Sequence, residues 1–142
     1  MDSAIIIALI SLAGSIIVAS MTYYLSKKEG IRKEWRNEKI NHYRKLLSSI
    51  SDLAIDGQNI DEANLRFAEA VNTIGLVAPQ AVVTALMNFH DEIKFSNPNK
   101  SIKKHDELLV ELILEIRKDI KIQSKDKKDS FKFHLVGTKP KK

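Results

Sequence analysis

The chain has 142 residues and no cysteine, and its 23 Lys and Arg exceed its 18 Asp and Glu, giving a net charge of +5 at pH 7. Without cysteine it can form neither a disulfide framework nor a thiolate metal site. The basic excess flanks an acidic middle: residues 27–45 hold 8 Lys and Arg against 3 Glu, residues 46–120 hold 7 against 12 acids, and residues 121–142 hold 8 Lys against 2 Asp. A nucleic-acid-binding domain carries positive charge on its folded surface, so we do not expect nucleic acid as a partner.

An uncharged apolar segment of 22 residues, Ala4 to Leu25, comes first. As an α-helix it reaches roughly 33 Å, enough to cross the hydrocarbon core of a bilayer. A cleaved signal peptide is the alternative, with Val18-Ala19-Ser20 as a loose cleavage site. That alternative requires positive charge ahead of the apolar run, whereas here the charge follows it. We therefore predict an uncleaved transmembrane anchor over residues 1–26.

Residues 27–45 then read as a basic juxtamembrane helix. Because Lys and Arg close to a span stay on the cytoplasmic side, we expect a single-pass protein of the inner (cytoplasmic) membrane. Its N-terminus lies outside and its C-terminal domain in the cytoplasm. Each Lys or Arg near the anionic lipid surface contributes about 1 kcal/mol to membrane binding. The side chains expected to contact lipids of the inner leaflet are Lys27, Lys28, Arg32, Lys33 and Arg36.

One face of the predicted span carries small residues at alternating spacings of four and three. In lipid, helices associate where small side chains let backbones approach and where Ser or Thr can hydrogen-bond across. This face, called the seam below, predicts self-association or docking on a partner's span, although such residues are also common in membrane helices without that role. The seam consists of Ala4, Ala8, Ser11, Ser15, Val18 and Thr22.

Apolar residues at helical spacing continue through the middle of the chain. We expect the first helix to run on from the span, past a potential kink at Gly30, and to end near Asp56-Gly57. A second helix fits Asp61 to Val77, with Asp61 as its N-cap. The positions expected to face the core in these two helices are Ile40, Tyr43, Leu46, Leu47, Ile50, Leu53, Ala54, Phe67, Val71 and Ile74.

A third helix should begin at Pro79, which suits a first turn. After a turn at residues 96–100, Ser101 can cap a fourth helix that runs to about Ile122. The positions expected to face the core in the third helix are Val82, Leu86, Phe89 and Ile93. Those in the fourth helix are Leu109, Leu112, Ile113, Ile116 and Ile120.

The third and fourth helices should form an antiparallel hairpin. If its turn centres on residues 97–98, paired residue numbers add up to about 195, which matches the two apolar faces. This register pairs Ile93 with Ile102, Leu86 with Leu109 and Val82 with Ile113.

The same register places His90 beside His105, each the first residue of a His-Asp-Glu tripeptide. Two imidazoles with nearby carboxylates could hold a metal ion. However, neither helix presents two ligands at the i, i+3 or i, i+4 spacing, and acids at a helix N-terminus are favoured by the dipole alone. We therefore expect a polar pair rather than a metal site, and no cofactor.

The pattern as a whole predicts an all-α fold: one N-terminal transmembrane helix, then a small cytosolic bundle of three to four helices that ends in an antiparallel hairpin. The helical domain covers residues 46–122. We expect the basic tail, residues 123–142, to be disordered. Within it Phe131, Phe133 and Leu135 alternate with polar residues, the pattern of a short two-faced strand.

Four short motifs add a family resemblance to this architecture. They are Tyr43-Arg44-Lys45-Leu46-Leu47, then Phe67 with Ala70, Asn72 and Ile74, then Val82 with Leu86 and Phe89, and finally Leu108-Leu109 with Ile113 and Ile116-Arg117-Lys118-Asp119. Together, over roughly residues 1–122, the chain resembles small, mostly uncharacterised single-pass membrane proteins of bacteria and their phages. The resemblance implies an architecture and no activity. Arg117 and Asp119 can be read as helix-terminal charges that make local pairs.

No arrangement of nucleophile and base, no phosphate-binding Gly-rich loop and no metalloprotease helix is present, so we do not expect an enzyme. The leading hypothesis is a membrane-anchored helical module that assembles or recruits a partner, with membrane lipids and either a second copy or a membrane or cytosolic protein as partners. The alternative is a membrane effector, of the pore-forming, lysis or phage-defence type, whose span oligomerises under the control of the cytosolic domain.

Overall fold

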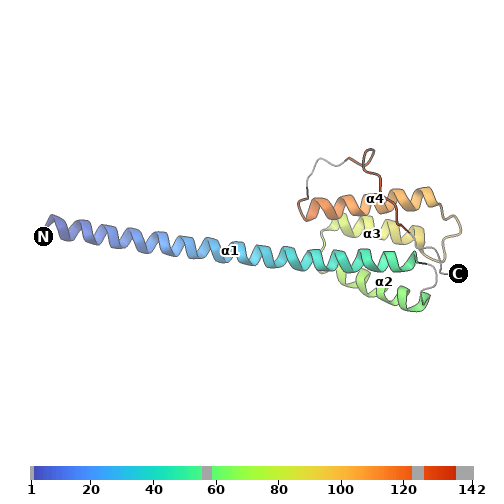
Figure 1. Cartoon of the computed structure of the whole chain (residues 1–142), viewed down its shortest axis with the longest axis horizontal. Coiled ribbons are helices and arrows are strands. Elements are labelled where there is room, and N and C mark those ends of the chain that lie inside the picture. The colour runs from blue at the N-terminus through green and yellow to red at the C-terminus, as the bar shows by residue number, and fades with distance from the viewer. Residues whose placement is uncertain (1, 56–58, 123–126, 137–142) are drawn as a thin grey trace. The chain divides into compact units, whose positions relative to one another are not determined.

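The computed structural model describes residues 2–55, 59–122 and 127–136. These residues form four α-helices and no strand: α1 (Ser3–Leu53), α2 (Ile60–Ile74), α3 (Gln80–Ile93) and α4 (Ile102–Asp119) (Figure 1). The predicted all-α fold class is confirmed. The chain divides into two compact units, residues 1–37 and residues 38–142. We call them the N-terminal unit and the helical unit.

The N-terminal unit is the first part of α1, a helix of 51 residues. Its described residues are all exposed, and by length and composition the helix is apolar enough to cross a membrane. As predicted, α1 continues through the basic stretch, and Gly30 lies within it without interrupting it. The helix ends at Leu53, and the predicted end at Asp56-Gly57 falls outside the described residues.

The core of the helical unit is built from all four helices. Apolar side chains at helical spacing meet there because each amphipathic face can leave water only against another. The predicted faces are confirmed at most positions, while Ala54 is exposed. The buried core residues are Tyr43, Leu46, Ile50, Phe67, Ile74, Val82, Ala85, Leu86, Phe89, Leu109, Leu112 and Ile116.

The helix ends differ from prediction in detail. The N-cap of α2 is Asn59, whose side-chain oxygen accepts a hydrogen bond from the Asp61 amide at 3.2 Å, so Asp61 lies inside the helix. The helix ends at Ile74 and not Val77, since the chain passes into a turn there. Pro79 is the N-cap of α3 and not part of its first turn. Ser101 caps α4 as predicted, with its Oγ 3.5 Å from the Lys104 amide nitrogen.

The C-terminal end of α4 closes with a residue in the left-handed region. Lys121 has φ 59°, the Ile122 amide donates to the Arg117 carbonyl at 2.9 Å, and the Lys121 amide donates to the Lys118 carbonyl at 3.1 Å. This pair of bonds is the Schellman motif, which usually has glycine at the left-handed position. The helix therefore ends at Asp119, three residues before the predicted limit.

The predicted hairpin forms, with α3 and α4 side by side (Figure 1). The rings of Phe89 and His105 have centroids 5.2 Å apart, and Lys104 lies 3.2 Å from Glu92, so the register is close to the expected one. One predicted core pair fails: Ile102 is 86% exposed, because it lies in the first turn of α4.

Residues 127–136 lie against α4, which differs from the expectation of a disordered tail. Lys128 Nζ is 2.7 Å from a Glu111 carboxylate oxygen, the guanidinium of Arg117 lies 5.3 Å from the centre of the Phe131 ring, and Leu135 packs on the core. No strand forms in this segment. The predicted behaviour of residues 123–126 and 137–142 lies outside the described residues.

Candidate functional site

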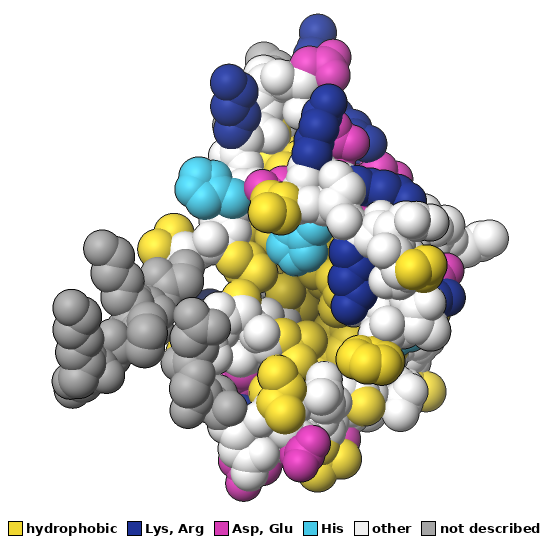
Figure 2. Space-filling model, turned by 90° about the vertical axis from the view of Figure 1, so that its right-hand side faces the viewer, with side chains coloured by type: hydrophobic (Ala, Val, Ile, Leu, Met, Phe, Trp, Pro, Cys, Tyr) yellow, Lys and Arg dark blue, Asp and Glu magenta, His cyan; other side chains and the backbone are white. Residues whose placement is uncertain are grey.

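An open apolar cavity lies at the end of the helical unit where α1 and α3 end and α2 and α4 begin. Its volume is about 560 Å³, within the range of small-molecule sites. Figure 2 looks onto this end and shows hydrophobic side chains gathered around a hollow, with histidine and Lys or Arg side chains beside it. The apolar residues that line the cavity are Ile50, Leu53, Ala54, Ile60, Phe67, Phe89, Ile93, Phe95 and Leu135.

The polar lining of this cavity is basic. It consists of Lys94, Lys100, His90, His105 and the amide side chain of Asn64, and no Asp or Glu is among the described residues that line it. The Lys94 ammonium is paired, because its Nζ lies 2.9 Å from a carboxylate oxygen of Asp91, a residue that does not line the cavity. Lys100 makes no ion pair with a described residue. The site therefore combines apolar walls with a positive charge that is not neutralised within the described chain.

His90 and His105 both line the cavity, and each ring packs on an aromatic side chain. The His90 ring stacks on Phe67 of α2, with centroids 6.2 Å apart, and the His105 ring lies tilted against Phe89. His105 Nδ1 is 3.0 Å from an Asp106 carboxylate oxygen. No group of three or more possible metal ligands occurs among the described residues. Each imidazole thus packs against a phenylalanine ring, and the polar pair of the two histidines stays a prediction.

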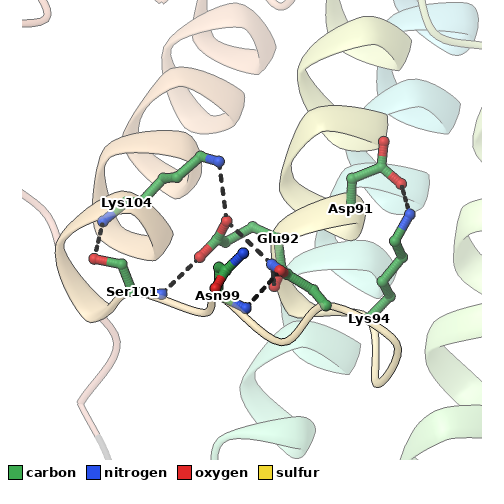
Figure 3. Close-up of polar contacts among 7 residues, drawn as sticks. Asp91, Glu92, Lys94, Asn99, Ser101 and Lys104 are labelled. Atoms are coloured by element: carbon green, nitrogen blue, oxygen red, sulfur yellow. Dashed lines mark hydrogen bonds and ion pairs between the residues drawn. The ribbon is translucent and has the colours of Figure 1, made fainter.

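Glu92 organises the connection between α3 and α4 (Figure 3). This carboxylate is only 3% exposed; one oxygen accepts a hydrogen bond from the Ser101 amide at 2.7 Å, and the other lies 3.2 Å from Lys104 Nζ. The Asn97 side-chain amide donates to the Glu92 carbonyl at 2.9 Å. The hydrogen bond from the Ser101 amide lowers the pKa of Glu92 most, and Lys104 and the Asn97 side chain lower it further, although burial of the carboxylate acts in the opposite direction.

Glu92 is not among the predicted site residues, although its position in the sequence held a signal. Glu92 follows Phe89 by three residues, so it lies on the apolar face of α3, where a carboxylate requires compensating donors. Its role is structural: it fixes the turn beside the cavity.

A second polar cluster joins α1 to the end of α4. One Asp119 carboxylate oxygen is 2.9 Å from Lys39 Nζ, and the other accepts a hydrogen bond from the Tyr43 hydroxyl at 2.6 Å. Burial, followed by the contact with Asp119, raises the pKa of Tyr43 above its ordinary value, so the phenol remains a donor. Asp119 therefore makes tertiary contacts across 76 to 80 residues of sequence, and the interpretation of it as a local pair was wrong.

The residues predicted to meet the membrane or another span all lie on exposed parts of α1. The Ser15 hydroxyl donates to the Ser11 carbonyl at 2.8 Å, so its proton is used within the helix. The same helix carries the rest of the seam and all of the predicted lipid contacts. The other seam residues are Ala4, Ala8, Val18 and Thr22, and the lipid contacts are Lys27, Lys28, Arg32, Lys33 and Arg36.

Comparison with known proteins gives no family for this chain: no family model, no curated protein and no solved structure matches it. The fold and the site therefore define the protein only as an all-α chain with one helix able to span a membrane and a separate helical unit.

Proposed function

We propose that this chain is a single-pass membrane protein of the inner membrane, with its N-terminus outside, and that its cytoplasmic helical unit is a non-enzymatic interaction module. The observation that carries the proposal is the composition of α1. One unbroken helix contains both the uncharged segment and the buried core residues Tyr43, Leu46 and Ile50. The same helix therefore includes both the proposed membrane span and part of the core of the helical unit.

The basic residues that follow the apolar segment support the proposed orientation. They are exposed on α1, where they can meet anionic lipids, and the rule that Lys and Arg remain inside favours a cytoplasmic helical unit.

Cysteine labelling tests this topology cleanly because the chain has no cysteine of its own. Ser3→Cys and Ser130→Cys each place one thiol at an exposed position in a different unit. With a membrane-impermeant maleimide, Ser3→Cys should react in intact cells and Ser130→Cys only after lysis. The reverse pattern would refute the orientation. Release of the whole protein by alkaline carbonate would refute the anchor itself.

The oligomerising effector is the second candidate, and the seam favours it. At 100° per residue, the seam covers one side of α1 and Ala13 lies on the opposite side. Ala8→Leu should therefore break a seam-driven oligomer in mild detergent, whereas the matched Ala13→Leu should leave its mass unchanged. An oligomer that survives both substitutions, and that also forms from residues 31–142 alone, would instead assign assembly to the helical unit.

A further inference from the structure

We propose that the cavity at the end of the helical unit binds a free single-chain fatty carboxylate, with the alkyl chain between the apolar walls and the carboxylate at Lys100. This inference concerns the helical unit alone, and it holds whether or not the seam drives assembly.

The walls supply the apolar half of such a site. Phe67 and Phe89 line the cavity and are buried, and Ile93 and Leu135 line it and are half-buried. The cavity therefore reaches the edge of the hydrophobic core. Phe95 is fully exposed and Ile60 is 63% exposed at the same opening. Each methylene moved from water into such an environment should strengthen binding about fourfold, so affinity should rise with chain length.

The charge of the lining selects an anion. Lys100 has no ion pair within the described chain, and His90 and His105 add imidazole nitrogens at the cavity wall. An adjoining hollow does contain the carboxylates of Glu92 and Asp106. Both are already engaged, Glu92 with Ser101 and Lys104, and Asp106 with His105. A cationic amphiphile of the same length would place its charge beside Lys100 and should be rejected.

The size of the cavity suits a single alkyl chain. Its volume of about 560 Å³ lies in the range that holds drug-sized molecules, and a two-chain phospholipid is the other occupant that the test below distinguishes.

Photocrosslinking of the full chain in lipid nanodiscs tests the proposal. The probe is a twelve-carbon fatty carboxylate with a diazirine at its methyl end, and the labelled peptides are mapped by mass spectrometry. We expect label on cavity residues such as Phe67 and Phe89, and also on the apolar segment of α1, which serves as an internal reference. Lys100→Glu should reduce cavity labelling about fivefold relative to that reference, as the loss of an ion pair at an exposed lysine predicts.

The matched control is Lys103→Glu, an exposed reversal of charge on α4 outside the cavity, which should leave cavity labelling unchanged. Both substituted side chains are exposed, so the helical unit should fold in each variant. Three results would overturn the proposal: equal labelling in wild type and Lys100→Glu, equal labelling by an alkylammonium of the same length, or equal labelling by a phospholipid that carries the diazirine on its acyl chain. Label confined to the α1 segment would also overturn it.

Discussion

The substitution Asp119→Asn distinguishes a tertiary role of this carboxylate from a local one, because the two roles predict changes of opposite sign in the free energy of unfolding. Asp119 is the last residue of α4, where the helix dipole disfavours a negative charge. If its surroundings were only local, removing the charge would stabilise the protein by about 0.3–1 kcal/mol. The structure predicts the opposite sign, because Tyr43 and Lys39 both use the charged carboxylate.

The expected loss follows from the two contacts. A hydrogen bond to a charged group contributes about 1.5–3 kcal/mol, and Asn keeps a weaker acceptor for Tyr43. The pair with Lys39 is part-exposed, at 29% and 13% for the two side chains, and adds at most about 1 kcal/mol. After subtracting the relief at the helix dipole, Asp119→Asn should lower the free energy of unfolding by about 1–2 kcal/mol.

Pulse proteolysis of the full chain across a urea series in mild detergent measures this free energy. For urea slopes of about 1–3 kcal/mol per molar, the midpoint should fall by roughly 0.3–2 M. Glu115→Gln removes a charge from the same helix, where Glu115 pairs locally with Lys118, and should shift the midpoint little. Tyr43→Phe combined with Asp119→Asn should cost less than the sum of the two single changes. A midpoint that rises in Asp119→Asn would refute the tertiary contact.

Three further predictions concern the helical unit. Lys121→Gly should stabilise it by about 0.5–1 kcal/mol, because glycine adopts the left-handed conformation without strain; an unchanged urea midpoint would contradict this. Because folding lowers the pKa of Glu92, ionised Glu92 stabilises the folded state above its unfolded pKa, and this contribution is lost as the pH falls through the folded value. In acid titrations followed by circular dichroism, Glu92→Gln should therefore lose less stability than wild type between about pH 5 and pH 3, whereas Glu107→Gln should follow wild type. Leu86→Ala, at a fully buried site, should cost about 3–5 kcal/mol in urea unfolding; a cost no larger than that of Met87→Ala, at a 38% exposed site, would show that Leu86 does not pack in the core.

The sequence alone determined the elements and most of the faces. Helical spacing fixed Tyr43, Leu46, Phe89 and Leu109 as core residues, since an amphipathic stripe can leave water on one side only. It also fixed Ser101 as a cap and the uncharged segment as a helix long enough for a bilayer. These features depend on neighbours within a few residues, which a local pattern records.

Only the tertiary structure decided how distant groups meet. It placed Tyr43 and Lys39 on Asp119, buried Glu92 against the Ser101 amide and packed His90 on Phe67 and His105 on Phe89. It also brought residues as far apart in the chain as Ile50 and Leu135 around one cavity, which Lys94 and Lys100 line as well. A carboxylate or an imidazole looks the same in the sequence whether it is solvated or buried. Its environment is set by the packing of segments far apart in the chain, and no periodicity encodes that packing.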